Sequence, residues 1–514
     1  MRSKKALLNI LFSLILQMTT IICGFIVPKL IISNFGSDVN GLISSINQFL
    51  GYIVLIEAGM GGVVRAALYN PLAKSDILNI SKILNAAEKF FRVIAIIFIA
   101  YLVIISIVFP YIVKDQFNYF FSCSLVLIIG ISTFFQYYFG ISYQILLQAD
   151  QKKYITTNLQ IITIFINTII TIVLIKIGAN IHLVKTLSSI IFIIRPIILN
   201  YYVSKKYNIV KKIKNQDIDI NQKWDGFAHH IAFFLHNNTD IVLLTIFSGT
   251  KEVSVYSIYY LVVSSVEKII STFSSGLEAA FGNMIAKGEN ENLHRNFNIF
   301  ELSSFIITTI MYTSTTILIL PFVNLYTLGI TDIDYYRPIF AYLLILTQAI
   351  YCIRAPYNSV VLAAGHYKQT RNGAFIEASI NIILSVVLVQ LWGGVGLVFG
   401  TLCAMIFRTT QYARYLSNHI LKRDIWIFWK KISVYLINAL VLIYILDTNM
   451  MQILDSYSKW AIYSVIITLI VSITTFFTSL LFYFKDMKNL YLLLKNLLIN
   501  TGIYNRVKYY LHKV

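Results

Sequence analysis

Long runs of hydrophobic residues, separated by short polar segments, follow one another along the whole chain. A helix needs about 20 mostly apolar residues to cross the hydrocarbon core of a bilayer. Runs of about this length predict fourteen transmembrane helices: 6–32, 39–64, 90–112, 117–148, 155–177, 181–203, 227–247, 253–285, 300–328, 336–364, 370–392, 395–418, 430–448 and 460–484. The pattern therefore predicts an all-α integral membrane protein.

The composition agrees with this prediction. The chain is 57% hydrophobic and only 13% charged, with a mean hydropathy of +0.72, which is typical of polytopic membrane proteins. The first run follows three basic residues, as a secretory signal would, but it is too long and lacks a small-x-small cleavage site, so we expect a retained span. The four cysteines include no CxxC pair, which indicates neither a disulfide framework nor a zinc site.

Basic residues distinguish the two sides of the membrane. Most of the 42 lysines and arginines fall at the termini and in alternate connections, whereas the other connections hold only Lys29, Lys114, Lys176, Lys185, Lys251, Arg337 and Lys459. Short cytoplasmic loops collect such residues, so both termini are predicted to be cytoplasmic. The net charge of +19 is then explained by contacts with membrane lipid headgroups, and no nucleic-acid partner is expected. Two amphipathic segments, 75–91 and 489–514, are predicted to lie in the membrane interface, as anchors or as gating elements.

The second half of the chain repeats features of the first half at an offset of 211 to 215 residues. The matches are DVNGLIS with EVSVYSI and GVVRAAL with GLEAAFG; Pro110 with Pro321; LLQADQKKY with VLAAGHYKQ; and Asn158, Asn167 and Arg195 with Asn372, Asn381 and Arg408. Six spans in each copy give both copies the same orientation, which predicts two parallel six-helix lobes related by a pseudo-two-fold axis along the membrane normal. The predicted parts are an N-terminal lobe (1–203), a basic cytoplasmic linker (204–226), a C-terminal lobe (227–418), two extra transmembrane helices (419–484) and a basic amphipathic cytoplasmic tail (485–514).

Several of these features together resemble the Wzx-type polysaccharide flippases, which move O-units or capsule repeat units and belong to the multidrug/oligosaccharidyl-lipid/polysaccharide (MOP) exporter superfamily. The features are the twelve-plus-two spans, the repeat, the opening QMTTIICGFIVPKLIISNFG (Gln17–Gly36) and the stretch EAGMGGVVRAAL (Glu57–Leu68). The resemblance covers essentially the whole chain, and it rests on spacing and small residues.

This resemblance implies a multi-pass protein of the bacterial plasma (inner) membrane that is not an enzyme. It would move a polyprenyl-pyrophosphate-linked oligosaccharide from the cytoplasmic to the outer leaflet for surface polysaccharide synthesis, by alternating access and without ATP hydrolysis. Other membrane proteins of polysaccharide assembly would be its partners. No cofactor is expected, apart from H⁺ or Na⁺ as a coupling ion.

The stretch VLIEAGMGGVVRAAL (Val54–Leu68) places glycines inside an apolar run. Gly59, Gly61 and Gly62 do not form GxGxxG and follow no strand, which argues against nucleotide binding. We expect them to act in helix packing or as a hinge, with direct approach of substrate as the alternative. Gly276 in the second copy and Pro28 in the first span are assigned the same packing or hinge role.

Basic side chains inside the spans are candidates for a cationic cavity that binds pyrophosphate, since a charge within the bilayer is costly and tends to face a partner or a wet cavity. These candidates are Lys268, Arg354, Lys29 and Arg65. The alternative for Lys268 is an ion pair with Glu57 or Glu278, and the alternative for Lys29 and Arg65 is extension to the membrane surface.

In the lipid II branch of the resembled superfamily, charges on the first, second and eighth spans line the cavity. Lys29, Arg65 and Lys268 fit that pattern, with lysine in place of arginine at two positions. Two other arginines, Arg195 and Arg408, are predicted to be structural and to reach the cytoplasmic headgroups along their own helices.

Acidic residues in or near the spans are the candidates for coupling transport to H⁺ or Na⁺, and the sequence does not choose among them. They are Glu57, Glu267, Glu278, Asp240 and Glu377. His229, His230 and His236 cluster without further ligands, so no metal site is predicted. Two aromatic groups are predicted to be either glycan contacts near the outer half or ordinary packing residues: Gln136, Tyr137 and Tyr138, and Tyr256, Tyr259 and Tyr260.

Three alternative functions stay open at this point. An exporter of cationic drugs or metabolites from the same superfamily would use the acidic residues, and a flippase for peptidoglycan precursors would differ only in its glycan. A membrane-embedded glycan polymerase or ligase would need an acid-base constellation in a sizeable outer loop, and the sequence has none. The absence of GxxxxGK[ST] argues against ATP-driven pumping by this chain alone.

Overall fold

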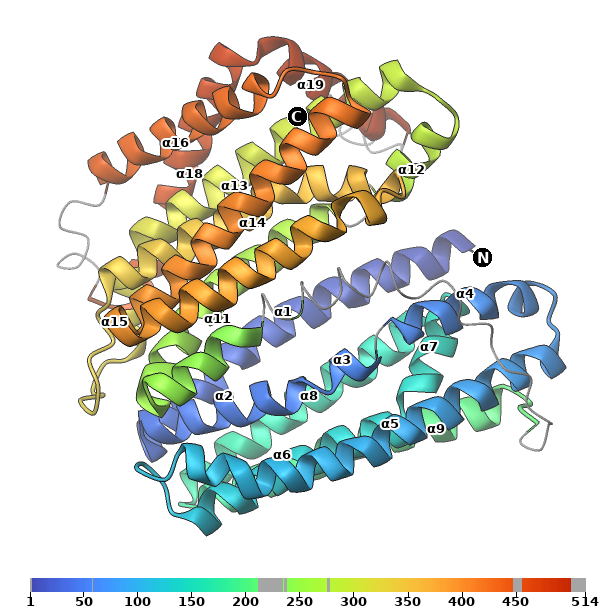
Figure 1. Cartoon of the computed structure of the whole chain (residues 1–514), viewed down its shortest axis with the longest axis vertical. Coiled ribbons are helices and arrows are strands. Elements are labelled where there is room, and N and C mark those ends of the chain that lie inside the picture. Colours follow the sequence, from blue (N-terminus) through green and yellow to red (C-terminus); the bar gives the residue numbers. More distant parts are fainter. Residues whose placement is uncertain are drawn as a thin grey trace, which may run out of the picture. The chain divides into compact units, whose positions relative to one another are not determined.

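The structure is a computed structural model of the chain, and it describes residues 2–57, 59–210, 234, 238–274, 278–446 and 455–500. These residues form helices and no strands. The helices of the first half are α1 (Arg2–Phe35), α2 (Ser37–Gly51), α3 (Val54–Glu57), α4 (Met60–Ala73), α5 (Ile77–Ile112), α6 (Tyr119–Phe139), α7 (Ile141–Ala149), α8 (Lys153–Lys176) and α9 (Ile181–Lys206). Those of the second half are α11 (Thr250–Ser274), α12 (Glu278–Ala286), α13 (Asn290–Tyr326), α14 (Pro338–Ala363), α15 (Tyr367–Tyr415), η1 (Leu416–Ile420), α16 (Trp426–Leu446), α18 (Tyr457–Phe482) and α19 (Phe484–Asn500) (Figure 1).

Twelve helices of the described part are long and apolar enough to cross a membrane, which confirms the all-α membrane fold. One of them, Tyr367–Ile420, covers two predicted spans, 370–392 and 395–418. It consists of two helices that meet at Gly393, where the backbone angles are non-helical (φ 57°, ψ −137°). Ser385 Oγ donates to the Leu397 carbonyl at 3.2 Å, so the two limbs of this segment run back along each other. The predicted span 227–247 lies mostly outside the described residues, which include only Phe234 and its last part, helix Asn238–Phe247.

The predicted interface helix 75–91 is not a separate element. It forms the first half of α5, which continues without a break to Ile112. Asp76 caps this helix by accepting a hydrogen bond from the Asn79 amide at 3.0 Å. The junction of the two predicted elements, residues 89–93, contains no proline or glycine, so nothing there interrupts the helix.

The backbone repeats with the same spacing as the sequence. A positive φ is adopted easily only by glycine, so such residues mark sharp turns between helices. Four of them in the first half match four in the second half, each pair 213 to 215 residues apart: Gly36 with Gly249, Ser75 with Gly288, Gln151 with Gly365, and Gly178 with Gly393. The turns, like the spans, therefore recur in order.

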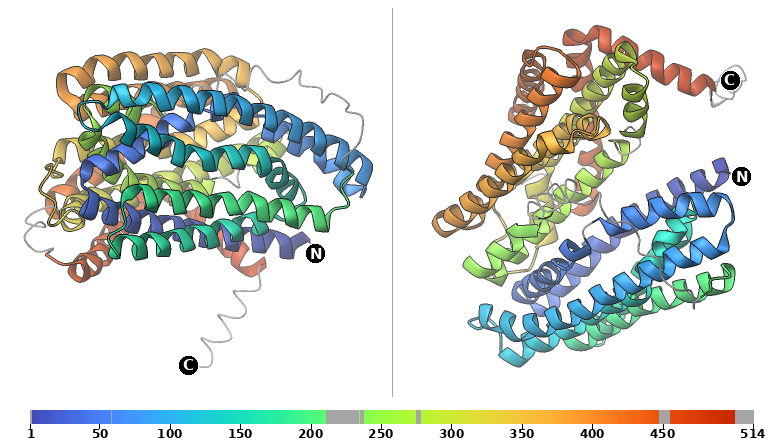
Figure 2. Two further views of the ribbon diagram at one scale, coloured as in Figure 1. Left: turned by 90° about the horizontal axis from the view of Figure 1, so that it is seen from below. Right: turned by 45° about the vertical axis from the view of Figure 1, so that its right-hand side comes forward.

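By packing, the chain divides into two compact units. Unit 1 comprises Met1–Leu261, Tyr326–Tyr335 and Ala374–Thr401, and unit 2 comprises Val262–Leu325, Tyr336–Gly373 and Leu402–Val514. In unit 1, α6 packs between α5 and α9, while α8 packs against α1 (Figures 1 and 2). The lobe boundaries based on the repeat are a different division of the chain and stay a prediction.

One acidic residue ties together the ends of several helices in unit 1. The Asp150 carboxylate lies 2.5 Å from Lys152 Nζ and 3.4 Å from Lys5 Nζ, and it accepts a hydrogen bond from the Tyr207 hydroxyl. Burial alone would raise the pKa of Asp150, but hydrogen bonds from Lys152 and Tyr207 and the charge of Lys5 outweigh it and lower the pKa. The carboxylate therefore stays ionised at neutral pH.

Helices α2 and α11 approach each other closely at Gly41. A Cβ atom at this position would lie 1.7 Å from the Thr250 carbonyl oxygen. Polar side chains close the same contact, since Asn40 Nδ2 donates to Ser254 Oγ at 2.8 Å. Small residues of this kind let membrane helices pack backbone against backbone.

We expect Gly41→Ala to destabilise the protein by about 1–3 kcal/mol, because the added methyl group forces α2 and α11 apart. Thermal unfolding of the purified protein in detergent would measure the loss. Gly51→Ala is the matched control, since a Cβ there meets no atom within 4 Å. Equal stability of the two variants would contradict the close approach.

Unit 2 contains a buried ionic cluster, which we call the Glu301 cluster and define as Glu301, Tyr357, Arg423 and Lys431. Lys431 Nζ lies 2.6 Å from Glu301 Oε2, and Arg423 and Tyr357 also donate to the carboxylate. Glu301 is fully buried, and Lys431 is nearly so. The cluster joins α13 and α14 to the start of α16.

Candidate functional site

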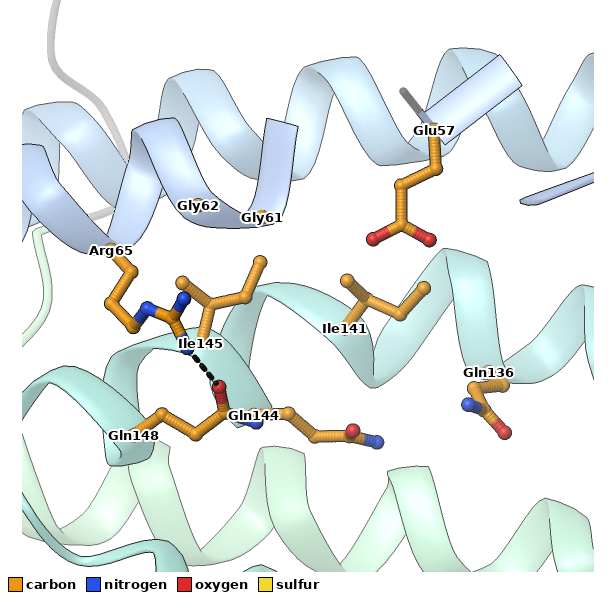
Figure 3. A pocket seen from close by; sticks show the side chains of 9 residues that line it. All are labelled: Glu57, Gly61, Gly62, Arg65, Gln136, Ile141, Gln144, Ile145 and Gln148. Carbon is orange, nitrogen blue, oxygen red and sulfur yellow. Dashed lines mark hydrogen bonds between the residues drawn. The ribbon is translucent and has the colours of Figure 1, made fainter. Parts of the chain in front are cut away.

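A polar pocket of about 360 Å³ opens within unit 1 between α3 and α4 on one side and α6 and α7 on the other (Figure 3). Most of its lining side chains are charged or carry amides, although the surrounding helices are apolar. The lining residues are Glu57, Gly61, Gly62, Arg65, Gln136, Ile141, Gln144, Ile145 and Gln148. We call this the Gln144 pocket.

Two helix breaks form the pocket. Gly59 has a left-handed backbone (φ 77°), and it separates α3 from α4 within the predicted second span. Gly140 separates α6 from α7, and a Cβ atom on it would lie 2.9 Å from the Cβ atom of Pro196 in α9. Only glycine therefore fits at either break without strain or displacement of a neighbour.

Hydrogen bonds hold the polar side chains of the pocket in place. The Tyr137 hydroxyl donates to Glu57 Oε2 at 3.2 Å. Arg65 Nη1 donates to Gln148 Oε1 at 3.3 Å, as the dashed line in Figure 3 shows. Gln136 Oε1 accepts a hydrogen bond of 2.9 Å from Arg195 Nη2.

The structure thus brings together five of the residues singled out in the sequence: Glu57, Gly61, Gly62, Arg65 and Gln136. A Cβ atom at Gly62 would meet nothing within 4 Å, and one at Gly61 would make ordinary contact with Glu57 Oε1 at 3.5 Å. Gly61 and Gly62 therefore line the pocket without side chains, and the helix break itself lies at Gly59; a hinge role for these glycines stays a prediction.

The two arginines predicted to be structural, Arg195 and Arg408, both donate hydrogen bonds inside the protein. Arg195 donates to Gln136 beside the Gln144 pocket. Arg408 is buried in unit 2, where it donates to the Thr370 carbonyl at 3.0 Å and to the Tyr412 hydroxyl at 2.7 Å. Acceptors inside the protein satisfy both terminal nitrogens of Arg408, whereas Arg195 has one such hydrogen bond and its Nε is buried without a partner.

Lys29 lies elsewhere in unit 1, away from the residues of the pocket. Its Nζ donates to the Leu328 carbonyl at 3.4 Å and lies 5.8 Å from the centre of the Tyr326 ring. Pro28 precedes it inside α1, which runs as one helix from Arg2 to Phe35.

Three further candidates lie in unit 2. Lys268 is exposed, and within the described part of the chain its ammonium forms no ion pair. Glu267 is half-buried in the same helix, while Arg354 is buried with its guanidinium 4.9 Å from the centre of the Tyr351 ring. Gly276, the side chain of Glu278 and the histidines His229, His230 and His236 lie outside the described residues.

A second polar site surrounds Asp240 in unit 1. This buried carboxylate accepts hydrogen bonds from the Tyr256 hydroxyl at 2.9 Å and from the Thr401 hydroxyl at 3.2 Å. Asn381 Nδ2 donates to the same Thr401 hydroxyl at 3.0 Å, and Asn381 Oδ1 is buried without a hydrogen-bond partner. Glu377 is also buried, one helical turn before Asn381.

Sequence reasoning missed most of the amide side chains of the pocket. Gln144 and Gln148 follow the predicted glycan contact Gln136 within the same run, and their four-residue spacing on α7 puts them on one helix face. That spacing of polar residues inside an apolar run is the signal that could have indicated them.

Comparison with known proteins matched no protein-family model and no curated protein sequence. Solved structures do match. The lipid II flippase MurJ in an inward closed conformation aligns with a TM-score of 0.67 and 18% identity, covering 93% of this chain and all of that one. The chain has the fold of the MOP transporters.

Two transporters of the MATE type show the same fold. An inward-facing multidrug resistance MATE transporter of the MOP superfamily aligns with a TM-score of 0.61 and 12% identity, over 80% of this chain and 98% of that one. A mutant of the Vibrio cholerae MATE transporter VcmN aligns with a TM-score of 0.56 and 14% identity, over 82% and 99%. At these identities the likeness concerns the fold.

Proposed function

We propose that this protein is a flippase that moves a polyprenyl-pyrophosphate-linked oligosaccharide from the cytoplasmic to the outer leaflet of the bacterial inner membrane. Two lobes with cytoplasmic termini would alternate access to a central cavity, without ATP hydrolysis and without catalytic residues. The oligosaccharide would then serve surface polysaccharide synthesis, together with other membrane proteins of that assembly.

The observation that carries the proposal is the likeness to the lipid II flippase over nearly the whole of both chains. Because a fold can host several functions, the side chains must supply the specificity. The exposure of Lys268 and the position of Arg65 in the lining of a polar pocket support the proposal that both attract a pyrophosphate group. Lys29 and Arg354 complete the proposed cationic set.

The test is mass spectrometry of polyprenyl-pyrophosphate glycans in cells that lack the protein. We expect a complete, unexported oligosaccharide to accumulate, because its export stops. Lys268→Ala should accumulate it as well while remaining abundant in the membrane, since its ammonium no longer attracts the pyrophosphate. Lys287→Ala, an exposed lysine outside the spans, is the control and should export normally.

Other results would point elsewhere. An unfinished or unpolymerised unit on the outer face would indicate a polymerase or ligase, and normal export by Lys268→Ala would exclude an essential contact at that residue. Unchanged glycans together with increased sensitivity to cationic drugs would indicate a multidrug or metabolite antiporter. The MATE neighbours and the Glu57 carboxylate in the pocket favour this second candidate.

We further propose that transport is coupled to H⁺ or Na⁺ at Asp240. Its carboxylate contacts two hydroxyl groups, and no lysine or arginine pairs with it in the part of the chain that the structure describes. Asn381, whose Nδ2 donates to the same Thr401 hydroxyl, also has a buried Oδ1 atom without a hydrogen-bond partner. Oxygen atoms of this kind suit a proton or a hard cation. The other acidic candidates, Glu57, Glu267, Glu278 and Glu377, would then not be the coupling group.

A further inference from the structure

We propose that the Gln144 pocket binds the sugars of the transported lipid, next to the pyrophosphate. This inference rests on the proposed flippase function and deepens it by assigning the carbohydrate part of the substrate to named side chains. It is carried by the chemistry of the pocket wall, its size and the way its amides are held.

Three glutamine side chains form one wall of the pocket. Gln144 and Gln148 project from the same face of α7, and Gln136 joins them from the end of α6 across the break at Gly140 (Figure 3). A glutamine amide both donates and accepts hydrogen bonds, as each sugar hydroxyl does. Neutral amides match a polyhydroxylated ligand without requiring it to carry a charge.

Two of the three amides are also oriented by their neighbours. Arg195 donates to Gln136 Oε1 and Arg65 donates to Gln148 Oε1, so each arginine occupies an amide oxygen. The amide nitrogen of Gln136 is thereby turned toward the pocket, as Figure 3 shows. Donors fixed in this way are suited to hydroxyl oxygens of a sugar.

The remaining lining provides an apolar surface and one acceptor. Ile141 and Ile145 lie between the glutamines along α7, where the C–H face of a sugar ring can pack. Glu57 projects into the pocket from the opposite wall, and its carboxylate is fixed by Tyr137. Binding sites commonly combine apolar walls with a few placed polar groups in volumes of about 300–1,000 Å³.

The free-energy cost of placing these polar side chains within a transmembrane region favours a role in ligand binding. Polar side chains within the bilayer are expensive and are usually kept for function. Arg65 carries the nearest lining cation, so a sugar on the glutamines would place the adjoining pyrophosphate within its reach. The pocket would therefore recognise the junction between lipid and glycan.

The experiment measures binding of two lipids to the purified full-length protein in nanodiscs. One is the lipid-linked oligosaccharide isolated from cells that lack the protein, and the other is the same polyprenyl pyrophosphate without sugar. We expect the wild type to bind the glycosylated lipid at least about tenfold more tightly. Gln144→Leu should lose this preference while binding of the sugar-free lipid is unchanged.

The matched control is Gln390→Leu, which makes the same replacement at an exposed glutamine of α15 and should keep the preference. Equal binding of both lipids by the wild type, which needs no variant, would overturn the sugar pocket and leave the flippase function standing. A preference retained by a folded Gln144→Leu would also overturn it. Binding of neither lipid by the wild type would overturn the flippase function itself.

Discussion

Replacement of Glu301 by glutamine is expected to destabilise the protein by about 3–5 kcal/mol, because it leaves two buried cations without their carboxylate. Arg423 and Lys431 both pair with Glu301, and all three side chains are shielded from solvent. Thermal unfolding in detergent and the yield of folded protein would measure the effect. Glu291→Gln, at an exposed acid in the first turn of the same helix, should change neither.

Because the cluster holds two cations and one carboxylate, removing a cation should destabilise the protein less than removing the carboxylate. Lys431→Met removes one of two cations and leaves the balanced pair of Glu301 and Arg423, so we expect a much smaller loss than for Glu301→Gln. A loss from Lys431→Met as large as that from Glu301→Gln would show that packing around the lysine stem dominates over charge balance.

Asp240→Asn is expected to abolish ion-driven transport without preventing the lipid from binding, because the substitution removes the charge and keeps the shape. One charge moved through 100 mV is worth about 2.3 kcal/mol, so its loss would lower the accumulation ratio by up to about 50-fold. Proteoliposomes with an imposed Na⁺ or H⁺ gradient would measure this ratio and name the ion.

Asp115→Asn, at an exposed position between α5 and α6, is the matched control and should transport normally. Full gradient-driven transport by Asp240→Asn would move the coupling role to another acid. A wild type that responds to neither gradient would remove ion coupling altogether.

Span positions were predictable because each transmembrane helix needs about 20 apolar residues, and such runs can be identified directly in the sequence. Helix breaks were harder to predict. Gly140 gave no signal of its own, since its role depends on the approach of Pro196 from another helix. The continuous helix from Ile77 to Ile112 was also misjudged, because amphipathic and apolar segments joined without a breaker look like two elements.

The Glu301 cluster shows why the sequence alone does not predict whether charged residues near span ends are buried. Arg423 and Lys431 fit the excess of basic residues on one side, and Glu301 lies at the edge of a predicted span. Each is compatible with a solvated surface position when taken alone. The fold brings Arg423 and Lys431 to the Glu301 carboxylate, and these two ion pairs offset the free-energy cost of burying its charge.

The sequence by itself determined the all-helical membrane fold, the order of its spans and the repeat, because hydrophobic length and turn residues act locally. It also singled out Glu57 and Arg65 as charged residues, and Gly59, Gly61 and Gly62 as glycines, within a predicted transmembrane span. The tertiary structure decided which distant side chains share a site: Gln136, Gln144 and Gln148 with Glu57, and Asp240 with Thr401. Such groupings depend on how helices pack against one another, which cannot be predicted from the residue pattern of a single helix.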